Sequence, residues 1–424
     1  MVLGILSGLS SIAFHFLADR LGEALFEEGR NRLPFVVLIP AVGLCAIGIV
    51  LQRFPQGTLG GVKEVHESIT RHAGVVPIVR ALNVLLSGFV LAFGGSVGPE
   101  GPMVQVNALV GSRVGLAFGL SGHTLKTMVR AGAAAGIASA FRSPAGGVLL
   151  TLEVFGARFD RNLVAISVAA AAGYFIRIKV LGDGYPFRPA FTPDDVPLLC
   201  LLTVVPLMGL AAAPVGHAFI TLLDRMRATF PVKWPLWIRV TLGGVLVGCI
   251  GIWYPQVMSA GYPAIRDALA GRMDAALLAT LLLLKIVATS ITFGSGAVGG
   301  LFAPTLVIGA MFGGAFGFGI HSIMPKLVPQ PELFVLLGMI VMFASIVKGY
   351  WSGLLLVADM SGCYHPLLLP GILAGGIAYL LAWELRDRSV FGLPMDTGAG
   401  DEDGAQQPKR ARERAEESAA PVHL

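Results

Sequence analysis

The sequence predicts an all-α protein that crosses a membrane many times, with some helices that are broken or cross only half of it. Three observations support this fold class: a very apolar composition, a long uncharged segment interrupted by glycines, and an internal repeat whose two copies both carry such an interruption. Of the 424 residues, 55% are hydrophobic and 13% are charged, whereas soluble domains carry about 25% charged residues. The composition therefore indicates a polytopic membrane protein.

Apolar segments recur along the whole chain. One helical crossing of the hydrocarbon core needs about 20 residues, and the segments 144–157, 333–347 and 350–360 are shorter than that. We therefore expect half-crossing helices. The arginines in the polar stretch after the last apolar segment favour a cytoplasmic C-terminus, because orientation follows Lys and Arg.

The longest uncharged run, residues 286–325, spans 40 residues and is about two crossings long. Glycines break it between Gly294 and Gly300. A break at that depth is tolerated only where the backbone is buried in protein or lines a wet cavity. It is typical of a helix that begins inside the membrane with its amide end toward an ion or anionic substrate. Lys285 precedes the run, and we expect its ammonium to reach the membrane interface from the end of its segment.

An internal repeat relates residues 138–156 to residues 344–362 at an offset of 206. The match places Glu153 on Asp359, and we expect both acids to cap neighbouring helix ends. A second pair joins 98–102 to 299–304, and each of these ends in a proline, which suits a first helical turn. Chance similarity between membrane helices is the alternative. We divide the chain into a first repeat (1–180), a second repeat (181–394) and a disordered polar tail (395–424).

The interrupted segments predict an anion site. A helix N-terminus offers unpaired amides and about half a positive charge, and several that converge hold an anion weakly enough for release. The candidate helix starts, with the residues that support each break, are Gly60 and Gly61; Gly98, Gly101 and Pro102; and Gly299, Gly300 and Pro304.

Glu100 is the only acid between Glu67 and Glu153, and it lies inside one of these breaks. An ionisable group at membrane depth is functional by default, because burying it without a partner is costly. Its carboxylate could occupy the anion site and leave on protonation, which makes Glu100 a candidate gate. The alternative is a carboxylate that only caps its helix.

Two motifs resemble those of the CLC chloride channels and proton-coupled chloride exchangers. Residues 98–105 (GPEGPMVQ) resemble the family motif G-[KR]-E-G-P-x-V-Q, and residues 294–304 (GSGAVGGLFAP) resemble G-S-G-x-x-G-G-x-F-x-P. The resemblance runs from about residue 3 to residue 394. It implies an inverted-repeat fold, a homodimer with one pore per subunit, Glu100 as the gating glutamate, and backbone amides of Leu301 and Phe302 on the anion.

The sequence departs from the family pattern at four positions, one of which is Pro99, where the family has Arg or Lys before the gating glutamate. The anion-binding serine of the family falls on Gly60, with Thr58 as an alternative donor one register away, and the pore tyrosine falls on Phe391, which has no hydroxyl. The internal proton-transfer glutamate of exchangers falls on Val154, which cannot carry a proton. Through the resemblance, these differences favour weakened selectivity and channel-like or loosely proton-coupled transport.

We therefore predict transport of chloride or a similar small monovalent anion through a lipid bilayer, with protons as a candidate second substrate. A stoichiometric proton/anion antiporter is the first alternative. An intramembrane serine hydrolase that uses Ser352 and His365 is the second. We expect no enzyme activity, no cofactor, no metal and no nucleic-acid partner, and a bacterial chain would lie in the inner membrane.

Overall fold

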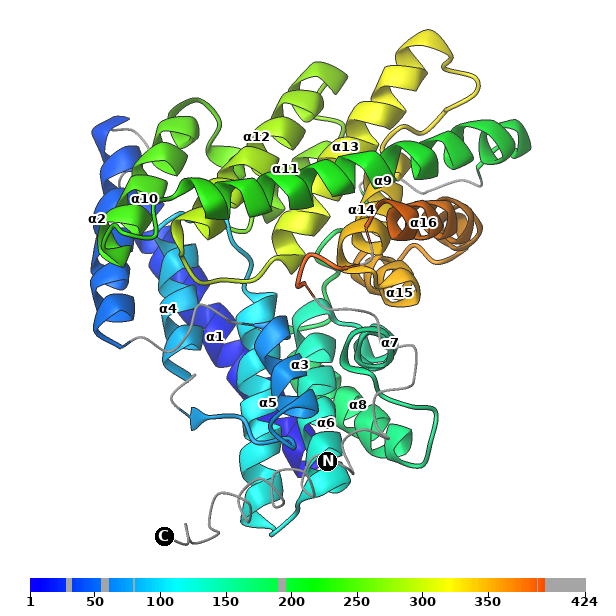
Figure 1. Cartoon of the computed structure of the whole chain (residues 1–424). Coiled ribbons are helices and arrows are strands. Elements are labelled where there is room, and N and C mark those ends of the chain that lie inside the picture. Colours follow the sequence, from blue (N-terminus) through cyan, green and yellow to red (C-terminus); the bar gives the residue numbers. More distant parts are fainter. Residues whose placement is uncertain (28–32, 55–60, 79–80, 190–195, 387, 393–424) are drawn as a thin grey trace, which may run out of the picture.

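The computed structural model describes residues 1–27, 33–54, 61–78, 81–189, 196–386 and 388–392. Within these ranges the chain forms helices joined mostly by short turns (Figure 1). The described residues form no named strand, and Gly98 and Gly300 form an isolated β-bridge. The helices are α1 (Val2–Glu27), α2 (Leu33–Arg53), α3 (Val62–Thr70), α4 (Ala81–Ala92), α5 (Glu100–Ala117), α6 (Gly122–Phe141), α7 (Pro144–Phe155), α8 (Asn162–Leu181), α9 (Leu198–Thr229), α10 (Leu236–Trp253), η2 (Pro255–Val257), α11 (Tyr262–Leu269), α12 (Ala275–Ser295), α13 (Phe302–Ile323), α14 (Leu333–Met342), η3 (Phe343–Val347), α15 (Tyr350–Ser361) and α16 (His365–Leu385).

Seven of the described helices are long and apolar enough to cross a membrane. Others are apolar but short, such as α4 and α7 with 12 residues each. At 1.5 Å per residue, 12 residues extend about 18 Å, which is little more than half of a hydrocarbon core about 30 Å thick. The expected mixture of full and half crossings is confirmed.

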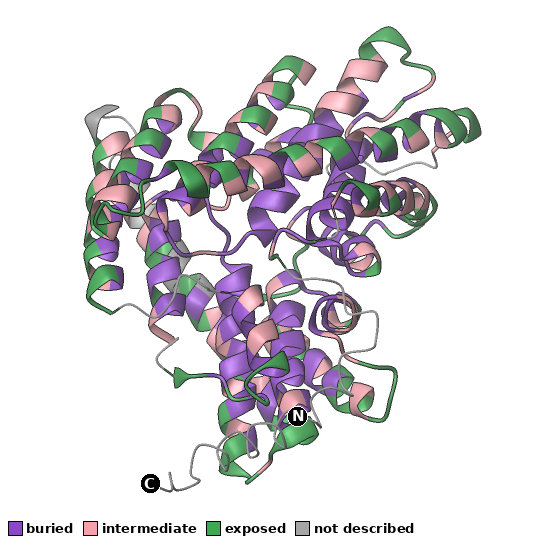
Figure 2. Cartoon of the chain, in the orientation of Figure 1, coloured by how far each residue is buried: buried purple, intermediate pink, exposed green. Residues whose placement is uncertain are grey.

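Helices in the core and helices at the outer surface are both apolar, and they differ in how far their side chains are buried. Helices α13 and α14 are buried over most of their length, whereas α9 carries exposed leucines along its outer side (Figure 2). Leu199 is 64% exposed and Leu202 is 63% exposed. Such apolar side chains are compatible with lipid tails, which are as apolar as leucine itself.

The repeat is visible in the backbone. Arg142 and Lys348, 206 residues apart, each end a helix with a positive φ, 56° and 66°. Gly156 and Gly362, at the same offset, have φ values of 60° and 74°. Positive φ is uncommon for residues other than glycine, so the matched pair Arg142 and Lys348 argues against chance similarity.

The two acids that the repeat matches each bond to the start of a helix in the other half of the chain. Glu153 of α7 accepts hydrogen bonds from the backbone amides of Trp351 (2.8 Å) and Ser352 (2.9 Å) at the start of α15. Asp359 of α15 accepts from the hydroxyl of Ser143, the N-cap residue of α7. Each acid therefore stabilises the start of the opposite helix, where the dipole favours negative charge. The expectation that both acids serve helix ends is confirmed, and the fold is an inverted repeat.

Candidate anion site

The two glycine-rich breaks pair directly with each other. The amide of Gly98 donates to the carbonyl of Gly300 at 2.7 Å, and the amide of Gly300 donates to the carbonyl of Gly98 at 2.9 Å. This isolated bridge joins segments that are 202 residues apart in the sequence. It brings the starts of α5 and α13 to one place in the molecule.

Both helices begin alike. Glu100 is the first residue of α5 and Phe302 the first of α13, so Pro102 and Pro304 each stand at the third helical position. A proline there sacrifices no hydrogen bond, since the first amides of a helix have no acceptor within it. The first bond in α13 that involves its N-cap runs from the Thr305 amide to the Leu301 carbonyl at 3.1 Å.

The helix starts lie close together, and at Gly101 only glycine fits without a shift of the backbone. A Cβ added to Gly101 would stand 2.7 Å from the Cα of Gly300, and a Cβ on Gly61 would stand 3.5 Å from the Cα of Gly101. Gly61 precedes α3 and has a φ of 68°, which also favours glycine. Gly299 packs against Val97 at the same bridge. The starts of α3, α5 and α13 therefore converge, and their positive dipole ends meet.

Glu100 lies within this convergence and not toward lipid, since it is only 3% exposed. The point where a Gly98 Cβ would stand is 2.6 Å from Glu100 Oε2 and 3.0 Å from the amide nitrogen of Ala303. The carboxylate therefore lies close to the first turn of α13. The amides of Phe302 and Ala303 have no acceptor within their own helix, so this position favours negative charge.

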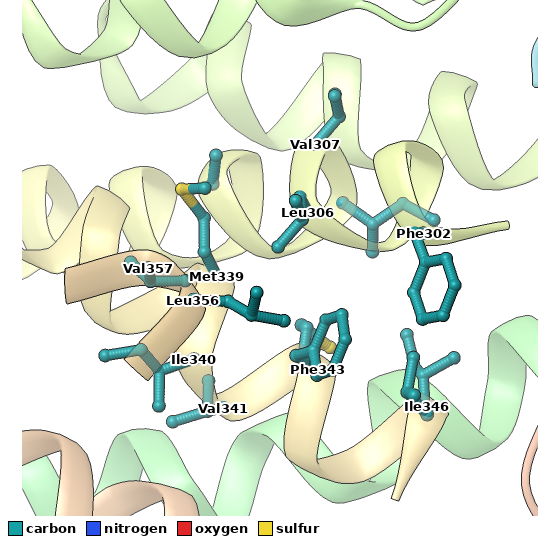
Figure 3. Close-up of a cluster of buried hydrophobic side chains, with 14 of the residues drawn as sticks. Phe302, Leu306, Val307, Met339, Ile340, Val341, Phe343, Ile346, Leu356 and Val357 are labelled. Atoms are coloured by element: carbon teal, nitrogen blue, oxygen red, sulfur yellow. The ribbon is translucent and has the colours of Figure 1, made fainter. Parts of the chain in front are cut away.

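Phenylalanine rings surround the first residue of α13. The Phe302 ring contacts Phe343 (5.6 Å between centroids), Phe391 (5.4 Å) and Phe141 (6.0 Å), and Figure 3 shows Phe302 facing Phe343. The loop that carries Phe391 is held by the Val390 amide, which donates to the Ile346 carbonyl at 2.9 Å. Phe391 carries no hydroxyl, so these contacts are made by apolar rings alone. The residue pattern identified Phe302 and Phe391, but the contacts of Phe141 and Phe343 with Phe302 were not expected.

The structure describes only part of the helix start that the sequence predicts near Gly60 and Gly61. Gly60 and Thr58 lie outside the described residues. The Gly61 amide donates to the side-chain oxygen of Gln105 at 2.8 Å, so in this structure a protein group occupies that amide. The Gln105 amide nitrogen in turn donates to Glu64 Oε2 at 2.5 Å.

The sequence analysis did not identify Glu64, although the spacing of apolar residues predicts the helix that carries it. Helix α3 is too polar to stand out as a membrane segment, but Val62, Val65 and Ile69 recur at helical spacing and are buried. Glu64, which is 4% exposed, departs from that spacing and faces α5 through Gln105. A helical-period search of this segment would have found α3.

The expectation for Lys285 is wrong. It lies in the middle of α12, fully buried, and its ammonium donates to the carbonyls of Val257 (3.0 Å) and Ser259 (2.9 Å). The physical reason is that buried carbonyls compensate the charge inside the protein, so the side chain has no need to reach the interface. Further along the same helix, the Thr292 hydroxyl accepts from the Ser96 amide at 3.2 Å. Helix α12 therefore supports the segment that leads to Gly98.

The positions of Ser352 and His365 do not support the alternative of an intramembrane serine hydrolase. Ser352 lies in the first turn of α15, and His365 begins α16 after α15 has ended. Ser352 and Ser361, the last residue of α15, are nine residue steps apart, which is about 14 Å at 1.5 Å per residue. A serine and its activating base must lie within about 3 Å.

Comparison with known proteins gives the family. The family model for the voltage gated chloride channel matches residues 42–383. A ClcB-like protein of Ralstonia nicotianae is 33% identical over 370 residues, which is 84% of each chain. The H(+)/Cl(-) exchange transporter ClcA of Vibrio cholerae is 30% identical over 414 residues, covering 92% of this chain and 87% of that protein.

Solved structures agree on the fold. A slow cyanobacterial Cl-/H+ antiporter superposes with a TM-score of 0.83 at 22% identity, covering 96% of this chain and 97% of that one. A CLC-type fluoride/proton antiporter superposes with a TM-score of 0.76 at 22% identity, covering 92% and 95%. With its multiple apolar helices, the chain is an integral multi-pass membrane protein, and it belongs to the voltage gated chloride channel (CLC) family.

Proposed function

We propose that this protein carries chloride or a similar small monovalent anion across the membrane, with Glu100 as its gate. The observation that carries the proposal is the burial of the Glu100 carboxylate beside the first turn of α13, where the starts of α3, α5 and α13 converge. The anion would use the same amides, including those of Leu301 and Phe302. The relatives named as chloride transport proteins support this substrate class.

The mechanism follows from competition between two negative charges. While Glu100 is ionised, its carboxylate occupies the positive ends of the helices and keeps an anion out. Protonation removes that charge, the side chain withdraws, and an anion from solution takes its place. Helix dipoles without a fixed ammonium or guanidinium bind weakly enough for the anion to leave again.

We propose channel-like or loosely proton-coupled transport as the mode. The supporting observation is Val154, a buried aliphatic residue at the position where exchangers of this family carry an internal proton-transfer glutamate. Stoichiometric antiport is the second candidate, and the name of the ClcA relative as an exchange transporter favours it. Under that candidate the protons need another internal route.

Assembly and orientation are part of the proposal. We expect a homodimer with one pore in each subunit, repeats at 1–180 and 181–394, and a cytoplasmic C-terminus in a bacterial inner membrane. The tail at 395–424 lies outside the described residues.

The test is anion flux from liposomes that contain the purified protein, recorded together with proton flux over a range of pH. We expect wild-type flux to depend on pH, and Glu100→Gln to keep anion flux but to lose that dependence. Glu384→Gln, an exposed acid on α16, serves as the control and should behave as wild type. An unchanged pH profile in Glu100→Gln would remove Glu100 from the gate, and a fixed proton-to-anion ratio in the wild type would favour the stoichiometric antiporter.

A further inference from the structure

A chain of buried hydrogen bonds connects an acid to one of the converging helix starts. The Gly61 amide donates to Gln105 Oε1 at 2.8 Å, and Gln105 Nε2 donates to Glu64 Oε2 at 2.5 Å. Gln105 is 2% exposed and Glu64 is 4% exposed. A single side-chain amide therefore links the carboxylate of α3 to the backbone amide that precedes the same helix.

The orientation of the Gln105 amide follows from its two neighbours. A backbone N–H can only donate, so the oxygen of the Gln105 amide must face Gly61. An ionised carboxylate can only accept, so the nitrogen must face Glu64. The charged acceptor makes this second bond the stronger of the two. Ionised Glu64 thus holds an acceptor oxygen against the Gly61 amide, and that oxygen repels an anion.

Protonation of Glu64 favours the opposite orientation of the Gln105 side-chain amide. A protonated carboxyl group has an O–H to donate, and Gln105, the side chain already bonded to Glu64 Oε2, can accept it through its oxygen once its amide turns over. When the amide turns over to accept that bond, its NH₂ group faces Gly61. The Gly61 amide then loses its protein acceptor, and two N–H donors, one from Gly61 and one from Gln105, face the same space.

We propose that Gln105 and Glu64 are positioning residues that make the Gly61 amide available to the transported anion when Glu64 is protonated. This inference rests on the proposed function. Gly61 packs against Gly101 at the start of α5, so an anion held there stands at the convergence that also contains Glu100. Proton uptake at Glu64 would therefore strengthen anion binding independently of the gate.

Other charged groups surround α3, which packs against α5, α6 and α7. On α3 itself and on these three helices they are Lys63, His66, Glu67, Glu100, Arg113, His123, Lys126, Arg130 and Glu153. Arg113 donates to the carbonyl of Val76, Arg130 donates to the carbonyl of Phe155, and the ring of His66 contacts the carbonyl of Val154. Gln105 is hydrogen-bonded directly to Glu64 Oε2, so its amide responds to the charge on Glu64.

The experiment measures chloride binding to the detergent-purified protein by isothermal titration calorimetry between pH 4.5 and pH 8. All variants carry Glu100→Gln, so that titration of the gate does not contribute. In this background we expect chloride to bind about tenfold more tightly at the acid end, which corresponds to one hydrogen bond to a charged group. Adding Glu64→Gln should abolish this pH dependence, because a neutral amide has no charge to lose.

Adding Gln105→Met should also abolish it, because methionine cannot relay the state of Glu64. Glu67→Gln is the matched control, a partly exposed acid one turn away on α3, and it should keep the tenfold change. Size-exclusion profiles identify any variant that does not fold.

The results separate the two proposals. Absence of chloride flux in wild-type liposomes would reject the proposed function. If that flux is present, two results would reject the inference alone. One is a pH-independent affinity in the Glu100→Gln protein, which decides the matter even if the double variants do not fold. The other is an undiminished pH dependence in a folded double variant with Glu64→Gln or Gln105→Met.

Discussion

Gly101→Ala tests whether the converging helix starts depend on close backbone contact. The added Cβ would stand 2.7 Å from the Cα of Gly300 and 3.8 Å from the carbonyl of Gly299. The first distance is about 1 Å shorter than an ordinary carbon–carbon contact. Because the nearest atoms belong to backbone, no side chain can rotate away. The start of α5 must therefore move from the Gly98–Gly300 bridge.

The magnitude follows from three contributions. Overpacking of this kind costs about 1 to 3 kcal/mol, and loss of the two bridge hydrogen bonds costs about 1 to 3 kcal/mol together. Alanine is favoured over glycine inside a helix by about 0.5 to 1 kcal/mol. We therefore expect the free energy of unfolding to fall by about 1 to 5 kcal/mol.

The assay is thermal unfolding of the detergent-purified protein, with chloride binding measured in parallel. Gly319→Ala is the control, because Gly319 lies in α13 and no heavy atom comes within 4 Å of the point where its added Cβ would stand. The control should unfold at the same or a slightly higher temperature and bind chloride normally. If Gly101→Ala matches the control in both measurements, the reasoning about close contact is refuted.

Two other substitutions probe groups that surround the site. Lys285→Met leaves the carbonyls of Val257 and Ser259 without their donor, and at about 1 to 3 kcal/mol for each unsatisfied group it should lower the unfolding temperature clearly. Lys326→Met, an exposed lysine, is the control, and equal unfolding temperatures would contradict a stabilising contribution from the Lys285 hydrogen bonds. Phe391→Tyr adds a hydroxyl beside Phe302 and should tighten chloride binding by about threefold to tenfold. An unchanged affinity in calorimetry would show that this ring does not face the anion.

Much of the candidate anion site could be predicted from the sequence alone, because the residues that define it act on their local surroundings. Glycine and proline act on the backbone next to them, so the patterns at 98–102 and 299–304 predicted helix starts without knowledge of their surroundings. The rarity of acids in apolar segments singled out Glu100 by the same kind of local argument. The offset of 206 further indicated that the two halves share one backbone course.

Partners that are distant in the chain required the tertiary structure. Gln105 occupies the Gly61 amide across 44 residues, and Lys285 donates to carbonyls 26 and 28 residues away. The sequence determined which residues could donate, accept or leave room for a backbone contact. The packing of the helices decided which of them meet, because a buried polar group bonds to whatever neighbour the fold brings within about 3 Å.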